Sequence, residues 1–469
     1  MIAPHEMAER ALQAASGLDG AIAIVTTSSR ADLRWARTTL TTNGESRHTE
    51  LTLVGFRRLA AGVATATLSR SQPDAAGIRA LVDAVAVSLA GATAAEDAYE
   101  LVEPASSTAS GRASSPLWSD AAPLTSSTAL SPLSNPLGHL FGSCVASDIE
   151  LFGYAEHELS TTWLASSTGL RLRHTQPSAR LEITAKSHGR SRSAWWGHAA
   201  DDFNDIDLVP GEHDLRRGLD WQARRISIDP GRRRAVLTPG AIGDLMVDLW
   251  WSASAREAVE GRSVFSAPEG RTRIGERLSP RSLTLASDPA DPQIPSSDFL
   301  STATSSDMSS AFDNGLGLER VNWLHDGVLE HLHCPRWLAR RSDVPVAVSA
   351  DTLRMTDASG DGSLDDLIAR TNDALLVTCV WYNRLVDPQT LLLTGLTRDG
   401  VYVVSGGEVI GATTNFRFND SPVAMLGRIT DAGVTQRTQP REMGDYAARV
   451  AMPAVTVEDF HFSTPSDAL

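Results

Sequence analysis

Three side chains that can bind zinc stand close together at His331, His333 and Cys334. Imidazole and thiolate are the usual zinc ligands, and a structural site needs about four of them in a tetrahedral arrangement. No second pair of such ligands lies nearby in the sequence, and Pro335 follows directly. A polar segment that ends at the proline explains the cluster better than a metal site, because short motif matches are often accidental.

Two acidic segments contain the oxygen ligands that Ca²⁺ or Mg²⁺ prefers. Residues 357–362 begin like a calcium-binding loop, but Ile368 stands where a bidentate carboxylate is needed. We interpret this segment as a turn before a helix, with Ser363 as its N-cap and Asp365 and Asp366 in its first turn. The other segment contains Asp201, Asp202, Asp205 and Asp207, and a solvated loop is the commoner origin of such a charge run.

The overall charge excludes some functions from first consideration. The 469 residues include 57 acidic and 42 basic side chains, which give a net charge of -15. A uniformly acidic chain does not attract nucleic acid or anionic lipid, so we expect neither as a partner. The sequence also contains no GxSxG nucleophile segment, no Walker A loop and no GxGxxG motif after a strand.

Cysteine content and apolar runs predict the compartment. The three cysteines, Cys144, Cys334 and Cys379, lie far apart and imply no disulfide framework, which fits a reducing cytosol. The first residues have no secretory signal pattern, and the longest apolar runs are far shorter than the ~18 residues of a membrane span. We therefore expect a soluble, cytoplasmic protein without a membrane segment.

The first part of the chain has the pattern of a helix, several strands and a second helix. Residues 5–16 and 74–91 have helical spacing, and strands are predicted at 21–27, 31–36, 49–56 and 62–69. Asn43 and Gly44 predict a turn between two of these strands. This order indicates an α+β unit with a mostly antiparallel sheet.

A change of composition follows at residues 104–135, which are rich in Ser, Ala, Thr and Pro and predict a long linker. Beyond it, the alternation of apolar residues predicts strands, and a charged segment predicts a helix at 213–226. The predicted strands cover residues 159–165, 169–174, 180–186 and 193–197.

The second half begins with a strand at 234–239 and an apolar helix that starts near Gly240. The rest is mainly β, with the clearest strands at 375–386, 390–397, 400–418 and 455–463. We therefore predict a two-domain α+β protein. Residues 1–225 would form an N-terminal α+β domain with a mostly antiparallel sheet, and residues 226–469 a β-rich C-terminal domain.

The end of the apolar helix, residues 255–262, resembles the metal-site helix of the TldD/PmbA (TldD/TldE) metallopeptidase family, whose peptidase subunit has an HExxxH pattern. Segments 33–44, 152–187, 191–197 and 378–422 also resemble this family, in the same order. The similarity spans nearly the whole chain outside the linker. It is closest to the TldE (PmbA) type of subunit in its actinobacterial form.

In the HExxxH pattern, imidazoles bind Zn²⁺ and the glutamate activates a bound water. Here Arg256 and Gly261 occupy the two histidine positions, and only Glu257 remains. Protonated arginine repels a cation and glycine has no ligand atom in its side chain. The resemblance therefore implies a chain with no metal and no catalytic residue of its own, and zinc or a similar metal is expected in a partner subunit.

In this family, a TldD-type catalytic subunit and a TldE-type subunit form a heterodimer that cleaves unfolded or leader peptides. The resemblance implies such a TldD-like partner here, and an extended peptide as substrate. The alternating polar residues Asn415, Arg417 and Asn419 could form a peptide-binding strand face, or an outward solvated face. The family's late cysteine ligand does not match Cys379, which is expected to be a buried core thiol.

Two other functions remain open at this point. The chain could be an enzyme in its own right that cleaves an amide in a specialised-metabolite pathway, with ligands drawn from His331, His333 or Cys334. It could also be a stand-alone peptide-binding protein that forms a homodimer.

Overall fold

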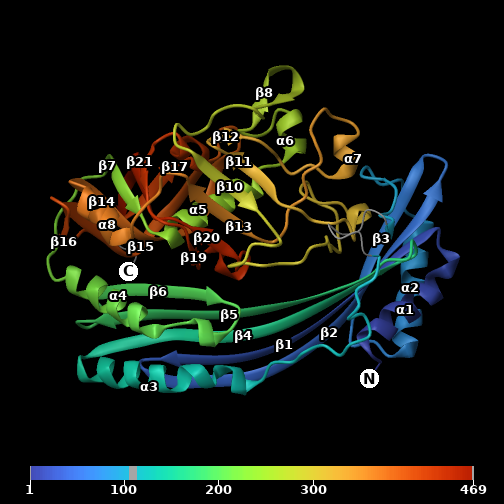
Figure 1. The fold of residues 1–469 in the computed structure, drawn as a ribbon, viewed down its shortest axis with the longest axis horizontal. Coiled ribbons are helices and arrows are strands. Elements are labelled where there is room, and N and C mark those ends of the chain that lie inside the picture. Colours follow the sequence, from blue (N-terminus) through green and yellow to red (C-terminus); the bar gives the residue numbers. More distant parts are fainter. Residues whose placement is uncertain (1, 105–112, 467–469) are drawn as a thin grey trace.

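The computed structural model of the protein describes residues 2–104 and 113–466. A long, twisted sheet from the N-terminal half lies along one side of the molecule, and the C-terminal half packs over one edge and one face of it (Figure 1). We call elements α1 to α4 with their sheet the N-terminal lobe, and elements from β7 onward the C-terminal lobe. The predicted α+β fold class is confirmed.

The sheet of the N-terminal lobe has six strands in the order β3-β2-β1-β4-β5-β6, and every neighbouring pair is antiparallel. Helices α1 and α2 pack at one end of this sheet, and α3 and α4 cover one face at the other end (Figure 1). The helices are α1 (Pro4–Ala14), α2 (Ala75–Ala90), α3 (Ser131–Ala146) and α4 (Leu208–Trp221). The strands are β1 (Gly20–Ala36), β2 (Thr39–Leu59), β3 (Gly62–Ser71), β4 (Ile149–Ser166), β5 (Arg171–Ser187) and β6 (Arg192–Ala200).

The predicted strands were too short, and the turn at Asn43 and Gly44 was wrong. The strands predicted at 21–27 and 31–36 form one strand, β1, because the polar residues between them continue the ladder with β2. Asn43 is paired with Leu33 inside that ladder, and the chain reverses instead at Arg37 and Thr38, whose φ angles are positive. The continuous pairing of β1 with β2 therefore determined the backbone conformation at Asn43 and Gly44, against the turn preference of these two residues.

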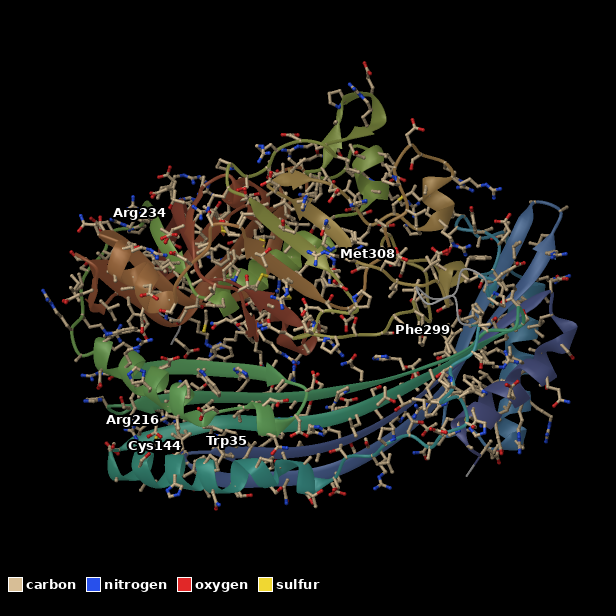
Figure 2. All side chains as sticks on the ribbon, viewed as in Figure 1. Trp35, Cys144, Arg216, Arg234, Phe299 and Met308 are labelled. Atoms are coloured by element: carbon tan, nitrogen blue, oxygen red, sulfur yellow. The ribbon has the colours of Figure 1, made fainter. Side chains whose placement is uncertain are left out.

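The predicted linker is also corrected, because its last residues belong to α3. This helix buries Leu133, Leu137, Leu140 and Cys144, which recur at three- and four-residue steps, against the sheet. Figure 2 shows Trp35 and Cys144 in the layer between the sheet and α3. The serine, proline and glycine residues on the outer side of the helix gave the segment the composition of a linker, so the apolar stripe was not recognised as a helix. Of the rest of the predicted linker, 105–112 lie outside the described residues.

The C-terminal lobe contains two larger sheets around a buried helix, α5 (Pro239–Trp251). In one sheet, β15 pairs with both β14 and β17, so the strands β14, β7, β21, β17 and β15 form a closed ring. These strands are β7 (Gly231–Leu237), β14 (Asp373–Asp387), β15 (Leu392–Ser405), β17 (Asn415–Asp420) and β21 (Val455–Ser466), with β16 (Glu408–Ala412) and β18 (Ile429–Ala432) paired alongside.

The second sheet of this lobe has the order β12-β11-β10-β13-β20-β19. Its strands are β10 (Leu283–Ser287), β11 (Val321–His325), β12 (Val328–Leu329), β13 (Leu353–Asp357), β19 (Gln436–Thr438) and β20 (Val450–Met452). The remaining elements are α6 (Ala255–Val259), α7 (Arg336–Ala339), α8 (Leu364–Arg370), α9 (Pro422–Leu426), β8 (Ser266–Ala267) and β9 (Arg271–Thr272). Across residues 2–104 and 113–466, no helix is long and apolar enough to span a lipid bilayer.

A buried ion pair holds the two lobes together at β6. The carboxylate of Asp399, at a tight bend in β15, accepts a hydrogen bond of 2.5 Å from the hydroxyl of Ser193 in β6. It also forms an ion pair with Arg441, whose guanidinium lies between the rings of Trp195 and Trp381. The side chain of Asp399 is 2% exposed. This cluster therefore joins the last strand of the N-terminal sheet to the C-terminal lobe.

We expect the substitution Asp399→Asn to lower the free energy of unfolding by about 3 kcal/mol, because it leaves the buried charge of Arg441 without its counter-charge. Asparagine tolerates the positive φ of this position, so backbone strain does not contribute. The matched control is Asp365→Asn, which removes an ion pair between Arg217 and a carboxylate that is 62% exposed and should change stability by less than about 1 kcal/mol. Urea unfolding of both variants checks this, and equal effects would contradict it.

Candidate functional site

A cleft of 510 Å³ lies where the edge of the N-terminal sheet meets the C-terminal lobe. One wall is formed by residues 194–198 of β6 and by α4. The opposite wall is formed by the beginnings of α5 and α8 and by residues 436–439, which include the edge strand β19. The cleft therefore lies between two strands that each end a sheet.

The outer edge of β6 is half closed and half open. Alternate residues of a strand direct their backbone groups to the same edge, and Ser191 and Ser193 direct theirs outward. The side-chain amide of Gln222 bonds both the N–H (3.1 Å) and the C=O (2.8 Å) of Ser193, and Arg225 donates to the C=O of Ser191. The outward backbone groups of Trp195 and Gly197 make no hydrogen bond with the part of the chain that the structure describes. Gln222 thus occupies the place of a neighbouring strand, and beyond it the edge faces the cleft.

Aromatic rings surround this open edge. Trp196 and His198 stack with ring centroids 5.7 Å apart, and Trp221 meets Tyr402 edge-to-face at 4.9 Å. Burial and the nearby positive charge of Arg437 lower the pKa of His198, so its imidazole is neutral at physiological pH. Flat aromatic rings of this kind can pack against the side chains of an extended peptide.

The carboxylates around the cleft are mostly engaged in local contacts. Asp207 caps α4 by accepting from the N–H of Val209, and Arg217 bonds both Asp214 (3.0 Å) and Asp365 (2.7 Å). Burial raises the pKa of Asp214. Within the acidic run at Asp201 to Asp207, Asp202 and Asp207 cap short helical segments and Asp201 pairs with Arg437.

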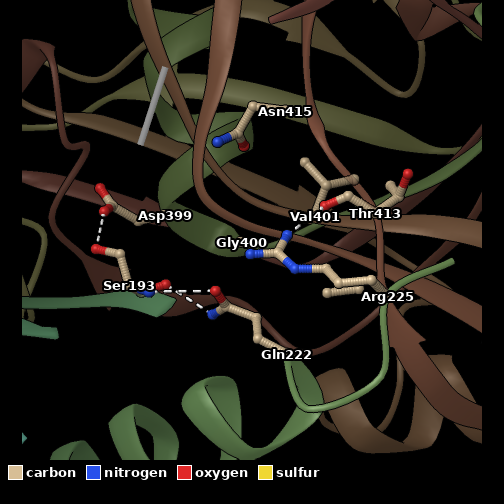
Figure 3. A pocket seen from close by; sticks show the side chains of 9 residues that line it. Ser193, Gln222, Arg225, Asp399, Gly400, Val401, Thr413 and Asn415 are labelled. Carbon is tan, nitrogen blue, oxygen red and sulfur yellow. Dashed lines mark hydrogen bonds between the residues drawn. The ribbon is translucent and has the colours of Figure 1, made fainter. Parts of the chain in front are cut away.

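A much smaller cavity of 20 Å³ lies near the first residues of β6, next to the ion pair of Asp399 (Figure 3). Figure 3 shows the side chain of Ser193 bonded to Asp399, and its backbone bonded to Gln222. Asn415 lines this cavity, and its volume suffices for about one water molecule. The space is too small for a peptide.

The three polar residues predicted on one strand face do share a face of β17. Phe416 and Phe418 between them are buried, Arg417 is exposed, and Asn415 and Asn419 are half-buried. However, β17 is paired on one side with β15 and on the other with β21, so it offers no open edge. The structure brings Asn415 near the cleft but leaves Arg417 and Asn419 on the outer surface of the closed ring.

A second hollow of 540 Å³ lies on the same side of the long sheet, under residues 444–448. Its floor is charged, since Arg30 pairs with Glu156 and Glu158 of β4 (3.0 and 2.8 Å). Arg180 reaches from β5 to Asp445 at 2.6 Å, which fixes the loop above the floor. The hydroxyl of Tyr154 donates to Glu182 in the wall between the two hollows, and burial raises the pKa of this tyrosine.

The predicted degenerate motif does not form one helix. The apolar helix α5 ends at Trp251, and Arg256 and Glu257 lie on the separate five-residue helix α6, which Ser254 caps. Arg256 forms ion pairs with three surface carboxylates, those of Glu96, Glu260 and Asp307. Gly261 follows the helix with a φ of 73°. All three residues therefore lie beyond the break that follows α5, which apolar periodicity did not reveal, and Gly261 stands just after the end of α6.

The six-residue spacing of an HExxxH motif also occurs on α5, where the acidic position is Asp248 and the two histidine positions are Val247 and Ser252. The sequence analysis missed this acid because it lies within an apolar stripe. Asp248 accepts a hydrogen bond of 3.1 Å from the side chain of Asn383. Burial, reinforced by the nearby charge of Glu442, raises its pKa to about 7. Neither occurrence of the spacing contains an imidazole or a thiolate.

Asp244, one turn before Asp248, is fully buried and also escaped notice. Its carboxylate accepts hydrogen bonds from the N–H groups of Arg441, Glu442 and Met443 (3.1, 3.1 and 2.9 Å). Burial raises the pKa of this carboxyl group well above its ordinary value. A buried acid inside an apolar helix was the available signal, since such a residue needs partners from elsewhere in the fold.

The remaining candidates have structural roles. The Nε2 atom of His333 lies 3.0 Å from the carbonyl of Trp250, and burial lowers its pKa to about 4. His331 bonds the carbonyl of Asn322 instead, and burial raises the pKa of the Cys334 thiol to about 12. Within the described ranges, no three His, Cys, Asp or Glu side chains are grouped so that they could hold a metal ion. Cys379 is buried, as predicted, and Ser363 caps α8 as predicted.

A family model for the PmbA/TldA metallopeptidase C-terminal domain matches residues 230–464, which is half of the chain. This chain belongs to the TldD/PmbA family. The predicted membership is confirmed. No curated protein sequence matches this member of the family.

Three solved structures share the fold of this TldD/PmbA family member over nearly its whole length. TldE from Thermococcus kodakarensis is 12% identical, covers 97% of this chain and 98% of its own, and gives a TM-score of 0.75. A candidate modulator of DNA gyrase from Bacteroides thetaiotaomicron is 13% identical, with 98% of both chains covered and a TM-score of 0.76. One from Thermotoga maritima is 14% identical, with 97% and 99% covered and a TM-score of 0.72.

The half-buried carboxyl of Asp248 predicts a pH-dependent stability. Its folded-state pKa is raised from 3.8 to about 7, so the folded protein binds this proton more tightly than the unfolded chain. The stabilisation is full below about pH 4 and is lost as the pH rises through 7. We therefore expect Asp248→Asn to gain stability relative to wild type between about pH 5 and pH 8, on the order of 1 kcal/mol or more. Urea unfolding at several pH values measures this, and a difference independent of pH would refute it.

Proposed function

We propose that this chain is the TldE-type, non-metal subunit of a TldD/TldE-type peptidase, and that it holds an extended peptide for cleavage by a TldD-like catalytic subunit. The observation that carries the proposal is the open edge of β6 in the cleft between the lobes. An extended peptide can add to such an edge through main-chain hydrogen bonds, which give affinity with little demand on sequence.

The walls of the cleft support a peptide as the ligand. Gln222 and Arg225 satisfy the edge up to Ser193, so an added strand would begin beside Trp195 and continue past Gly197. The five residues of β6 that line the cleft span about 15 Å, which accommodates a short extended segment. The tryptophans on both sides would contact its alternating side chains, because successive side chains of a strand point to opposite faces.

The side-chain chemistry supports a non-catalytic role for this subunit. On α6 and on α5, the positions that imidazoles would need are held by Arg256 and Gly261 or by Val247 and Ser252. His333, which could have supplied a ligand, bonds the backbone with its Nε2 atom inside a core of two tryptophans. We expect the catalytic zinc or similar metal in the partner subunit, and this division of labour requires the two chains to associate.

The first test is co-purification with a TldD-like chain from the same organism that has an intact HExxxH motif. We expect metal analysis to find about one zinc per complex and almost none in this chain alone, and unfolded peptides to be cleaved only by the complex. Substituting the partner's first histidine should abolish cleavage, whereas Glu257→Ala in this chain should leave it unchanged. Stoichiometric zinc with robust cleavage by the isolated chain would reject the proposal.

The second test compares Gly197→Pro with Gly197→Ala. Both variants add a β-carbon that would lie 2.4 Å from the ring of Trp195 as it now stands, so the ring must move equally in both. Only proline also removes the outward N–H group. We expect proline to weaken binding of a fluorescently labelled unfolded peptide about tenfold relative to alanine, the equivalent of one hydrogen bond. An edge strand tolerates proline where the N–H faces outward, so both variants should fold, which circular dichroism checks. Equal affinities of the two variants would exclude the β6 edge as the peptide site.

A further inference from the structure

A cluster of basic side chains lies where the lobes meet, outside the lining of the cleft. Lys186 is the only lysine of the chain, and all its other basic residues are arginines. It stands directly opposite Ser193 in the ladder of β5 with β6, so the two side chains share a face of the sheet. The hydroxyl of Ser193 bonds Asp399 of the C-terminal lobe (Figure 3). The amine of Lys186 is thus brought to the junction of the lobes.

Two arginines of the C-terminal lobe complete the cluster. Arg398 directly precedes Asp399 in β15, and Arg441 forms the ion pair with Asp399. The guanidinium groups of Arg398 and Arg441 lie 5.7 and 5.5 Å from the centre of the Trp381 ring. One aromatic ring therefore holds two groups of like charge, and Lys186 approaches them from the sheet.

The carboxylates beside the cluster are already bonded to other groups. Glu150, opposite Lys186 on β4, accepts two hydrogen bonds from Arg190 (2.6 and 3.2 Å). Asp399 is bonded by Ser193 and paired with Arg441, and it lies 3.7 Å from the Nε atom of Arg398, too far for a hydrogen bond. Across residues 2–104 and 113–466, neither the Lys186 nor the Arg398 side chain has a hydrogen-bond partner.

The surroundings disfavour the positive charge of both side chains. Burial, reinforced by the charges of Arg398, Arg190 and Arg441, lowers the pKa of Lys186. Burial, reinforced by the charge of Arg441, also lowers the pKa of Arg398. Like charges that a fold brings together are stabilised when an anion binds between them. Lys186 and Arg398 thus carry two positive charges that a bound anion would compensate.

The number and the shape of these groups favour phosphate as the anion. Two uncompensated charges match a phosphate monoester, which carries about −1.5 to −2 at pH 7, whereas a carboxylate carries only one charge. The planar fork of a guanidinium can bond two phosphate oxygens at once. The net charge of -15 repels a nucleic acid or an anionic membrane more strongly than a single small ion.

We propose that Lys186, Arg398 and Arg441 form a binding site for one phosphate group at the junction of the lobes. Lys186 and Arg398 donate to the phosphate oxygens, and Arg441 adds the attraction of its charge from between the two tryptophans. The group can come from inorganic phosphate or from a phosphate monoester of a small molecule. The inference does not rest on the proposed function, because none of the three residues lines the cleft and neither peptide nor partner is required.

The test uses Lys186 as a reporter, since no other lysine of the full-length chain interferes. Acetylation by N-acetoxysuccinimide, followed by mass spectrometry of peptides, measures the reactivity of its amine. We expect saturating inorganic phosphate to slow acetylation at least about fivefold, because the bound ion covers the amine and favours its unreactive charged form. Sodium chloride at the same ionic strength should slow it less than about twofold.

Phenyl phosphate distinguishes the two sources of the group. Protection at a lower concentration of phenyl phosphate than of inorganic phosphate would support the proposal with an organic monoester as the ligand. Equal concentrations would support it with phosphate itself as the ligand. Sodium acetate as effective as phosphate would overturn the proposal, because the site would then select no phosphate.

The matched variants are Arg398→Gln and Arg262→Gln. Each removes one guanidinium, but Arg262 is 54% exposed and pairs with Glu260 beyond α6. We expect Arg398→Gln to raise the phosphate concentration needed for half-protection at least about tenfold, and Arg262→Gln to change it less than about twofold. Circular dichroism checks that both variants fold, and the wild-type titration tests the site even if one does not. Acetylation that phosphate does not slow, equal slowing by chloride, or equal effects of the two variants would each overturn the proposal.

Discussion

The ion pair between Asp399 and Arg441 fixes the geometry on which the rest of the molecule depends. It places the carboxylate of a β15 bend against Ser193 and thereby holds the last strand of the N-terminal sheet beside the C-terminal lobe. Two buried charges repay their desolvation only when the geometry is good and further hydrogen bonds complete it. Ser193 supplies such a bond, and the two tryptophans flank the guanidinium. The edge of β6 is consequently presented in a cleft instead of lying free in solvent.

The backbone of β6 then decides what the cleft can bind. A polar side chain, Gln222, completes the edge at Ser193, and the backbone groups at the next two outward positions have no partner among the described residues. The same requirement for backbone partners operates at β2, but there the edge is long and unenclosed. One physical rule thus applies to two different surfaces, because the first edge lies in a cleft whereas the second lies exposed.

Several elements were predictable from local sequence because their signals do not depend on distant residues. The stripe of α5, the N-cap of α8 at Ser363 and the burial of Cys379 follow from periodicity, capping and local composition, and the structure confirms them. Helix α3 was missed because Ser and Pro dominate its composition, although its apolar residues have helical spacing. The turn at Asn43 was wrong because long-range pairing of β1 with β2 determines where the chain reverses.

The sequence by itself determined the family, the α+β class and the absence of imidazoles at the positions of the HExxxH spacing, since these are properties of residue identity and order. Only the tertiary structure decided which groups form the cleft. It placed Arg256 and Gly261 beyond the end of α5, buried Asp244 and half-buried Asp248. It also paired β17 on both sides, while β6 and part of β2 keep edges that no strand of the described residues covers. Such features depend on which strand lies beside which. That choice is made by burial and backbone hydrogen bonding over the whole chain, and no local segment of the sequence encodes it.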